Sequence, residues 1–311
     1  MPRGVHKYYV VEAHERERKQ RMEKQRIFID DILSNENMNR AYKQVIKNKG
    51  AAGIDGMEWN DLLSHLKENG HQLRESIRNQ SYKPMPVKRV EIPKDNGSKR
   101  KLGIPTVTDR MIQQAAAQVL TPIYERKFHT NSYGFRPGKS AQQAVLKAAE
   151  YMNEGYNWVV DIDLEKFFDT VEHDKMISIL NKEIKDGKTL SLIRKFLVSG
   201  VMVGEQMEET EIGTPQGGNI SPLLANILLN ELDWELESRG LRFVRYADDC
   251  IILVRSEKAA IRVMKSVTKY IENVLRLKVN KDKSRIGRPT EIQYLGFAFY
   301  YQFQEKKYRM K

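Results

Sequence analysis

The amino-acid sequence predicts an α+β fold. Runs with strand character alternate with runs of helical periodicity, and no internal repeat or low-complexity tract interrupts them. Two strand pairs are predicted as hairpins, one within residues 82–105 and one around residues 243–254. The chain has 311 residues, of which 40% are hydrophobic and 30% are charged. This length is sufficient for a buried core, arranged as one large domain or two modest ones.

The amino-terminal part is predicted to be helical. Residues 14–26 mix Arg and Lys with Glu and lack Gly and Pro, which predicts a helix that is polar almost all round. We expect residues 1–29 to form a basic helical extension, either a solvated helix or an RNA-binding arm. Its candidate RNA-binding residues are Arg16, Arg18, Lys19 and Arg21. From Ile27, apolar residues at helical spacing continue to Gly50, a residue type that commonly follows a helix end.

Residues 82–105 predict a basic hairpin. Strands at residues 87–93 and 99–104 flank the turn "KDNGS". Seven cations face only Glu91 and Asp95 here: Lys83, Lys88, Arg89, Lys94, Lys99, Arg100 and Lys101. Such a hairpin suits phosphate groups, and we take Lys88 and Arg89 as candidate RNA contacts. The alternative is a solvated edge hairpin whose charges prevent aggregation.

The middle of the chain predicts two helices, a strand and a further helix. A helix is expected over residues 109–128, kinked or ended by Pro122, and another after Ser140 as its N-cap. The strand that begins at residue 157 places Asp161 and Asp163 on one face, because side chains alternate along a strand. Residues 165–180 are predicted to be helical.

The segment "TPQGGNISPLLAN" predicts a Gly-Gly loop that leads directly into a helix. Ser221 is expected as the N-cap, Pro222 at the first helical position, and Gly240 after the last turn. The free N–H groups at such a helix start attract anions. Residues 257–275 predict an amphipathic helix, and two late strands are expected within residues 278–301.

The segment "FVRYADDCIILV" places Asp248 and Asp249 side by side within an apolar strand pair. Adjacent buried carboxylates are costly without a compensating charge, and a divalent metal would supply it. With Asp163 they could hold two Mg²⁺ ions about 3.5 to 4 Å apart, the arrangement used for in-line displacement at phosphorus. An Asp pair at a hairpin turn is often only a turn, but the flanking apolar pattern favours the metal site.

The composition favours a polyanionic partner. The formal net charge is 53 − 41 = +12, so nucleic acid is the first candidate and an anionic membrane the second. The longest uncharged window, Ile212–Asn230, contains "GTPQGGN", so no membrane span is expected. The single Cys250 excludes an intramolecular disulfide and cysteine-rich zinc sites, and we expect a reducing, cytoplasmic setting.

Six motifs together resemble a known family. "IPKDNGSKRKLGIP", "SYGFRP", "VDIDLEKFFDTV", "GTPQGGNISPLLANILLNELD", "YADD" and "LKVNKDKS" followed by "YLGF" occur in this order. Over roughly Met38 to Phe299 the chain resembles the reverse transcriptase domain of group II intron-encoded proteins, the intron maturases. Retron and diversity-generating reverse transcriptases share the Asp-Asp and Gln-Gly signals, whereas the longer blocks favour the intron group.

The resemblance implies a right-hand polymerase with fingers and palm, the palm being an antiparallel sheet backed by helices. We expect the fingers at residues 30–112 and 172–206 and the palm at residues 113–171 and 207–303. Residues 304–311 are then a tail, and the thumb is absent. The implied activity is that of an RNA-directed DNA polymerase, which transfers nucleotides from dNTP to a DNA primer on an RNA template. The implied partner is group II intron RNA, in a cytoplasmic ribonucleoprotein that supports splicing and retrohoming.

The resemblance also assigns catalytic residues. Asp163, Asp248 and Asp249 match the carboxylates that bind two Mg²⁺ ions, and the Leu164 carbonyl is expected to complete the coordination. Asp163 is selected rather than Asp161 because the metal-binding Asp of the family lies five residues before an aromatic, here Phe168. Asp161 is then expected to be structural.

Further matches concern the incoming dNTP. Lys94 and Arg100 match residues that hold its triphosphate, with Lys99 or Lys101 as alternatives. Phe168 matches the steric gate against a 2′-hydroxyl. Gln216 and Gly217 match the loop that shapes the nucleotide and template pocket, and Lys283 matches a lysine near the leaving pyrophosphate. Without the family, Phe168 is simply a packing residue and Lys283 a solvated lysine.

Three other functions compete with this one. The first is a non-catalytic intron-RNA-binding module for splicing, the second a retron-type reverse transcriptase, and the third a polymerase that makes RNA, against which the Phe168 match argues. The sequence leaves open whether the chain forms a homodimer and which intron it binds.

Overall fold

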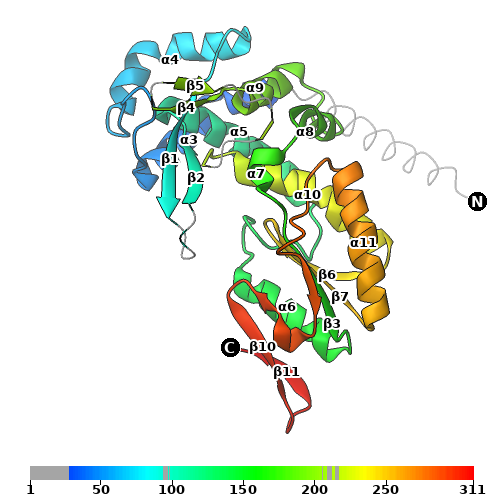
Figure 1. Cartoon of the computed structure of the whole chain (residues 1–311). Coiled ribbons are helices and arrows are strands. Elements are labelled where there is room, and N and C mark those ends of the chain that lie inside the picture. The colour runs from blue at the N-terminus through cyan, green and yellow to red at the C-terminus, as the bar shows by residue number, and fades with distance from the viewer. Residues whose placement is uncertain (1–27, 94–96, 98, 205, 209–211, 214–216) are drawn as a thin grey trace, which may run out of the picture.

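The structure is a computed structural model that describes residues 28–93, 97, 99–204, 206–208, 212–213 and 217–311. It has an elongated, two-part arrangement (Figure 1). A helix-rich part with the long β1–β2 hairpin lies at the top of the view, and a sheet flanked by helices lies below it. No helix among these residues is long and apolar enough to cross a membrane.

The upper part consists of helices packed beside a four-stranded sheet in the order β2-β1-β4-β5. The strand β1 pairs antiparallel with β2 and parallel with β4. The strands are β1 (Val87–Pro93), β2 (Lys99–Ile104), β4 (Val201–Val203) and β5 (Gln206–Glu208). The helices are α2 (Phe28–Ile32), α3 (Asn35–Asn48), α4 (Leu62–Arg78), α5 (Val107–Glu125), α8 (His173–Leu180) and α9 (Gly187–Leu197). Both strands of the predicted basic hairpin have the expected bounds.

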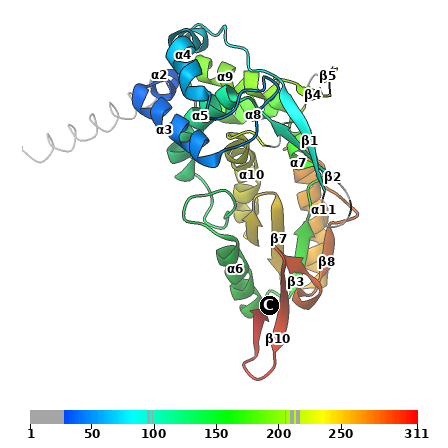
Figure 2. The same ribbon diagram turned by 90° about the vertical axis from the view of Figure 1, so that its left-hand side faces the viewer.

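The lower part is an antiparallel sheet in the order β6-β7-β3-β8. Its strands are β3 (Trp158–Ile162), β6 (Arg242–Tyr246), β7 (Asp249–Val254) and β8 (Arg285–Gly287). In Figure 2, α6 (Ala141–Asn153) and α11 (Glu257–Asn273) lie on opposite sides of this sheet. The α+β class and the antiparallel sheet backed by helices are therefore confirmed.

The apolar run at residues 250–254 arises because both faces of β7 are covered. Ile251 and Leu253 join a core cluster with Ala144 and Ala148 of α6. Ile252 and Val254 point the other way, into the main core that includes α10 (Ser221–Ser238) and α11. A strand that is buried on both faces has no polar side to alternate with its apolar one.

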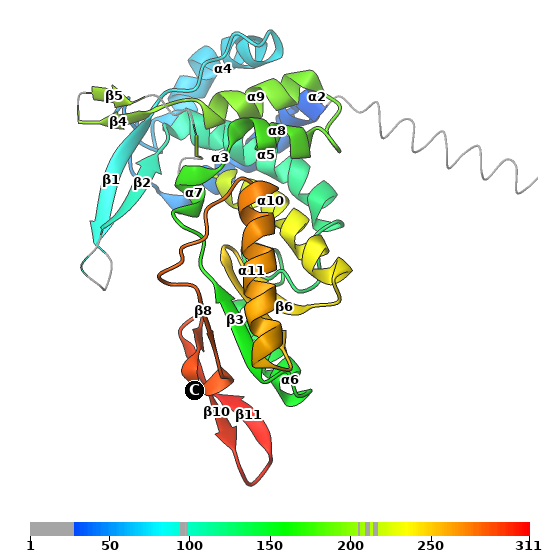
Figure 3. The same ribbon diagram turned by 45° about the vertical axis from the view of Figure 1, so that its right-hand side comes forward.

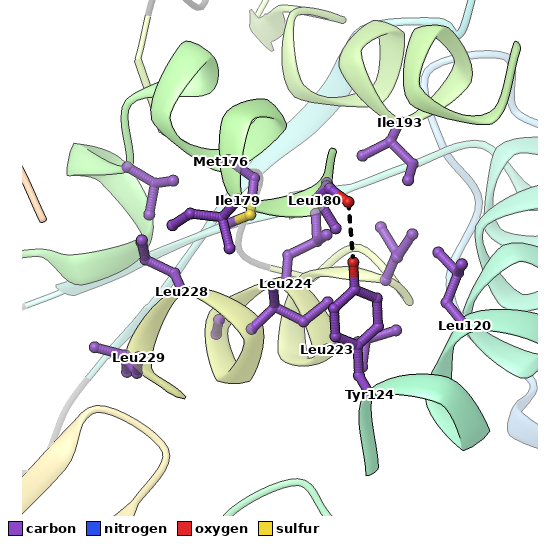
Figure 4. Close-up of a cluster of buried hydrophobic side chains, with 14 of the residues drawn as sticks. Leu120, Tyr124, Met176, Ile179, Leu180, Ile193, Leu223, Leu224, Leu228 and Leu229 are labelled. Atoms are coloured by element: carbon purple, nitrogen blue, oxygen red, sulfur yellow. Dashed lines mark hydrogen bonds between the residues drawn. The ribbon is translucent and has the colours of Figure 1, made fainter. Parts of the chain in front are cut away.

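The helices α5 and α10 carry the core from the upper part into the lower part. Figure 4 shows Leu223, Leu224 and Leu228 of α10 packed against side chains of α5 and α8. Within this cluster the Tyr124 hydroxyl donates a hydrogen bond to the Leu180 carbonyl at 3.4 Å. The two parts therefore share one continuous apolar core. Each leucine buried in it contributes about 1.5 to 3 kcal/mol.

Several helix boundaries differ from the sequence expectation. The helix expected from Ile27 to Gly50 is broken before Asn35, because the Ser34 side chain caps a new helix by accepting a hydrogen bond from the Asn37 N–H at 3.3 Å. Helix α5 continues past Pro122 to Glu125, since a proline near the carboxyl end disturbs few helical hydrogen bonds. The Ser140 cap is confirmed, with a complete capping box.

Two further boundaries were wrong. Residues 165–180 form α7 (Phe167–Thr170) and α8 rather than one helix, because the backbone of Val171 is extended. Ser221 is the first helical residue of α10, and Ile220 occupies the cap position. The remaining elements are the short helix at Pro289–Glu291 and the strands β9 (Gln293–Tyr294), β10 (Phe297–Gln302) and β11 (Lys307–Met310).

Candidate active site

The three predicted catalytic aspartates come together at one end of the lower sheet. Asp163 directly follows β3, and Asp249 begins β7. The pairing of Ile162 with Cys250 sets these two strand ends next to each other. Asp248 lies in the turn between β6 and β7, after Ala247, whose φ of 56° is left-handed.

These aspartates line a pocket of about 1320 Å³ between the two parts of the molecule. Its carboxylates are Asp163, Glu165, Asp169, Glu172, Asp248, Asp249, Glu272 and Asp282. Its cations are Lys99, Lys101, Lys166, Arg276, Lys278, Lys281 and Lys283. Leu164, Phe167, Phe168, Leu277, Val279 and Asn280 complete the lining. The pocket thus combines a cluster of acids with a surrounding set of cations.

Burial and the acidic surroundings of the pocket raise the pKa values of neighbouring aspartates. Although Asp249 is accessible to water, burial at the floor of the concave pocket and repulsion from Asp248, Asp163 and Asp161 raise its pKa to about 6. Burial also raises the pKa of Asp161, an effect that the neighbouring Arg285 opposes. Asp161 forms an ion pair with Arg285 at 3.4 Å and does not contribute to the described pocket lining. We therefore retain Asp161 as a structural residue.

The donor set suits a hard divalent cation. The pocket offers carboxylate oxygens, and no His or Cys lies among its described lining residues, which fits Mg²⁺. Within the described ranges, however, no three His, Cys, Asp or Glu side chains lie close enough together to hold a metal ion. Mutual repulsion among carboxylates favours such a separation, which a bound cation would offset.

The backbone at Leu164 leaves its carbonyl outside the local hydrogen bonds. Asn280 N–H donates to the Asp163 carbonyl and Glu165 N–H donates to the Lys278 carbonyl, both at 2.8 Å. Leu164 sits between these two bonds and forms neither of them. Leu164 also lines the pocket, next to Asp163.

Phe168 lies at the pocket in α7, directly after the buried Phe167. The two rings meet edge to face, with centroids 5.1 Å apart and an interplanar angle of 76°. Phe168 is half-buried and packs partly against the main core, so packing fixes a ring that also faces the pocket. This geometry suits both the packing role and the steric-gate role.

The basic hairpin reaches the pocket through Lys99 and Lys101. Lys99 forms an exposed ion pair with Glu91 at 2.8 Å. Lys88 and Arg89 lie on β1 and do not contribute to the described lining. Six predicted residues lie wholly outside the described residues: Arg16, Arg18, Lys19, Arg21, Lys94 and Gln216. The backbone of Arg100 belongs to β2, but its side chain is likewise outside the described part.

The Gly-Gly loop meets the hairpin by direct backbone approach. A Cβ at Gly217, which has a φ of 123°, would lie 2.4 Å from the Gly103 carbonyl oxygen of β2. Only glycine fits this position, and it joins the loop before α10 to the basic hairpin. Gly217 itself is not among the described pocket-lining residues, and Gln216 lies outside the described residues.

Lys283, for which a contact near the leaving pyrophosphate is expected, lines the pocket beside cations that the sequence reasoning missed. Its backbone N–H donates to the Asn280 side chain at 3.3 Å, which fixes the turn that carries it. Arg276 and Lys278 also reach the pocket. Lys278 belongs to the motif "LKVNKDKS", but neither it nor Arg276 was singled out, because only the pairing of residues 163–165 with residues 278–280 brings them there.

Sequence reasoning also missed a buried arginine behind the Asp248–Asp249 turn. Arg245 is fully buried, and all five of its N–H donors are used. It pairs with both Asp233 oxygens, at 2.7 and 2.5 Å. Its other acceptors are Asn226 Oδ1 at 2.9 Å, the Ala247 carbonyl at 2.8 Å and Ser132 Oγ at 2.8 Å. The signal was present in the sequence, since a charge within an apolar strand requires a partner.

The "SYGFRP" segment supports the same turn. A Cβ at Gly134 would lie 2.2 Å from the Ala247 backbone nitrogen, so only glycine allows this approach. The Gly134 carbonyl accepts a hydrogen bond from Asn226 at 2.8 Å. Asn226 thus links Gly134 and Arg245, and three motifs far apart in sequence position one turn.

Comparison with known proteins gives a family for this architecture. The family model described as "Reverse transcriptase (RNA-dependent DNA polymerase)" matches residues 92–299. The chain is 32% identical to Protein YkfC of Escherichia coli (strain K12), covering 86% of this chain and 80% of that protein. It is also 32% identical to the group II intron-encoded protein LtrA of Lactococcus lactis subsp. cremoris, covering 83% of this chain and 54% of LtrA. The chain thus spans about half the length of LtrA.

Solved structures agree with the fold. A chain of the partial Cas6-RT-Cas1–Cas2 complex aligns with a TM-score of 0.51 and 26% identity, covering 81% of this chain and 43% of that one. Telomerase from Candida albicans aligns with a TM-score of 0.54 and 13% identity, covering 71% of this chain and 45% of that one. At this identity the telomerase match concerns the fold alone.

Proposed function

Because the chain belongs to the reverse transcriptase (RNA-dependent DNA polymerase) family, with group II intron-encoded proteins among its relatives, we propose that its pocket extends a DNA primer on an RNA template. The observation that carries this proposal is the convergence of Asp163, Asp248 and Asp249 beneath the basic hairpin. The primer 3′-oxygen bonds to the α-phosphorus of a dNTP, and the bond to the pyrophosphate breaks. The 3′-hydroxyl proton passes to water, and pyrophosphate leaves with the electrons of the broken P–O bond.

The three aspartates and the Leu164 carbonyl would hold two Mg²⁺ ions in this site. When bound, the ions lower the pKa of the attacking hydroxyl and neutralise the developing charge on the leaving group. The aspartates themselves orient the reacting groups, because they are fixed at the ends of two paired strands.

Cations around the pocket bind the triphosphate in this proposal. Lys99 and Lys101 line the pocket from the hairpin. Lys94 and Arg100, predicted from the same hairpin, are the other proposed triphosphate contacts. Lys283 lies near the leaving pyrophosphate, and Gln216 and Gly217 shape the site of the base pair. Phe168 excludes a 2′-hydroxyl, so dNTP is preferred over NTP. The proposed fingers then lie in the upper part of the molecule, and the proposed palm comprises the lower part together with most of α5.

A group II intron RNA is the proposed partner, in a cytoplasmic ribonucleoprotein that supports splicing and retrohoming. The support is the relative LtrA, a group II intron-encoded protein, together with the net charge of +12. Candidate contacts are the cations of the extension, Arg16, Arg18, Lys19 and Arg21, with Lys88 and Arg89 on β1.

The double variant Asp248→Asn/Asp249→Asn tests catalysis separately from RNA binding. We expect primer extension to be abolished while affinity for the RNA template stays within about twofold, because the substitutions remove carboxylates and no cation. The matched control is Asp174→Asn, which removes an exposed carboxylate outside the pocket and should extend the primer normally. Extension by the double variant at the wild-type rate would contradict the proposed site. RNA binding without extension, even by the wild type, would favour a splicing module that only binds RNA.

A further inference from the structure

The outer face of α11 carries an uninterrupted row of cations. Lys258, Arg262, Lys265 and Lys269 are spaced by four, three and four residues, so they lie on one side of the helix. All four side chains are exposed. We call these four residues the α11 basic stripe. Along the helix axis the stripe is about 16 Å long, at 1.5 Å per residue.

Packing fixes the direction in which the stripe faces. Ala260, Val267 and Ile271 of α11 are buried in the main core, against the sheet. Figure 3 shows α11 in front of β3 and β6, as the outer layer of that side of the molecule. Because the apolar residues anchor one face of the helix, the stripe on the opposite face points away from the protein.

The stripe also lacks carboxylate partners. Over the ranges that the structure covers, none of its four cations forms an ion pair or a side-chain hydrogen bond. Some other exposed cations are paired, for example Lys127 with Glu183 at 2.9 Å and Lys182 with Glu231 at 2.6 Å. A helix face that only needs to be soluble usually carries interspersed charges of both signs, whereas the acids of α11, Glu257 and Glu272, lie at its two ends. Four unpaired like charges in a row favour a polyanionic ligand.

The stripe leads toward the catalytic pocket. The carboxyl end of α11 contributes Glu272 to the pocket lining, and Arg276 and Lys278 follow immediately after it. Lys269 is one helical turn before this end, and Lys258 is at the far end. Cations therefore continue from the outer face of α11 to the edge of the pocket.

We propose that the α11 basic stripe binds the phosphate backbone of a structured RNA outside the catalytic pocket. Neighbouring stripe cations are about 4.5 to 6 Å apart along the axis, a spacing on the same scale as the repeat of strand phosphates. Backbone contacts of this kind supply affinity without reading sequence. The surface is separate from the hairpin and the extension, and its role goes beyond primer extension.

The salt dependence of RNA binding tests the stripe directly. The logarithm of the RNA-binding constant falls as the logarithm of the salt concentration rises. Each phosphate contact that is lost should make this negative slope shallower by about 0.7 to 0.9. We expect the variant Lys258→Gln/Arg262→Gln/Lys265→Gln/Lys269→Gln to lose about three units of slope on a structured group II intron RNA. The matched control, Arg78→Gln/Lys127→Gln/Lys182→Gln/Arg194→Gln, removes the same charge from ion-paired cations and should lose less than one unit.

Three results would overturn the proposal. The first is an unchanged slope in the stripe variant, and the second is an equal loss of slope in the stripe variant and the control variant. The third is a stripe variant that binds RNA as the wild type does and loses only its binding to anionic lipid vesicles. Single-nucleotide extension at saturating primer-template separates this surface from the proposed catalytic function. The stripe variant should extend as the wild type does. If neither protein extends a primer and the slope still falls, the catalytic proposal fails and the RNA-binding surface stands.

Discussion

Asp249 connects the electrostatics of the pocket to the stability of the protein. Its pKa of about 6 lies above the ordinary value of 3.8, so the folded protein holds this proton more tightly than the unfolded chain does. The resulting stabilisation is fully present below pH 3.8 and is lost as the pH rises through about 6. Above that range the ionised Asp249 destabilises the metal-free fold.

The variant Asp249→Asn should therefore be more stable than the wild type at pH 7 and nearly equal to it at pH 4. Urea unfolding at both pH values, without divalent cations, measures this difference in free energy of unfolding. Added Mg²⁺ should reduce the advantage of the variant at pH 7. The control Glu68→Gln removes an exposed carboxylate on α4 and should show no such pH dependence. An advantage that is the same at pH 4 and pH 7 would contradict the repulsion among the aspartates.

Phe168 should decide the sugar preference. Phe168→Ala removes the ring from the pocket, and we expect ribonucleotide incorporation relative to dNTP to rise about tenfold or more, which corresponds to ~1.4 kcal/mol. Competing dNTP and NTP in single-nucleotide extension measures the ratio. Phe168→Tyr keeps the ring and should retain the dNTP preference. If the alanine variant is less stable but keeps its selectivity, Phe168 is a packing residue only.

At the scale of elements, the β6–β7 hairpin depends on the buried Arg245–Asp233 pair. Arg245→Met leaves Asp233 buried without its partner, which costs about 3 to 5 kcal/mol. The double variant Arg245→Met/Asp233→Leu removes both charges and should recover part of this loss. Urea unfolding of the two single variants and the double variant gives the coupling energy. Additive losses would show that the pair does not act as a unit.

Elements were predictable where several local signals agreed. The bounds of β1 and β2 followed from strand pattern and turn residues together, and the Ser140 cap from its local sequence. Breaks inside long helical patterns were missed because they depend on one backbone angle or one side-chain bond. The extended Val171 and the cap by Ser34 are such cases. Local periodicity continues across these points, so it cannot reveal them.

At the scale of the whole molecule, the sequence located the aspartates but not what surrounds them. Strand endings and motif resemblance led us to expect that Asp163, Asp248 and Asp249 converge, and the structure places them around one pocket. Arg276 and Lys278 reach the pocket only through a bridge between residues distant in sequence. The need for glycine at Gly134 and Gly217 is explained only by the close approach of backbone segments that are distant in sequence. Such contacts depend on tertiary structure, which single-sequence patterns do not contain.

The most direct test of the central claim is single-nucleotide extension of a DNA primer on an RNA template with Mg²⁺. The wild type is compared with Asp163→Ala, and dNTP with NTP. The account predicts addition of dNTP in preference to NTP by the wild type, and no addition by Asp163→Ala, while both proteins bind the template equally. Wild-type addition that persists in Asp163→Ala would contradict the assignment of this pocket as the polymerase site.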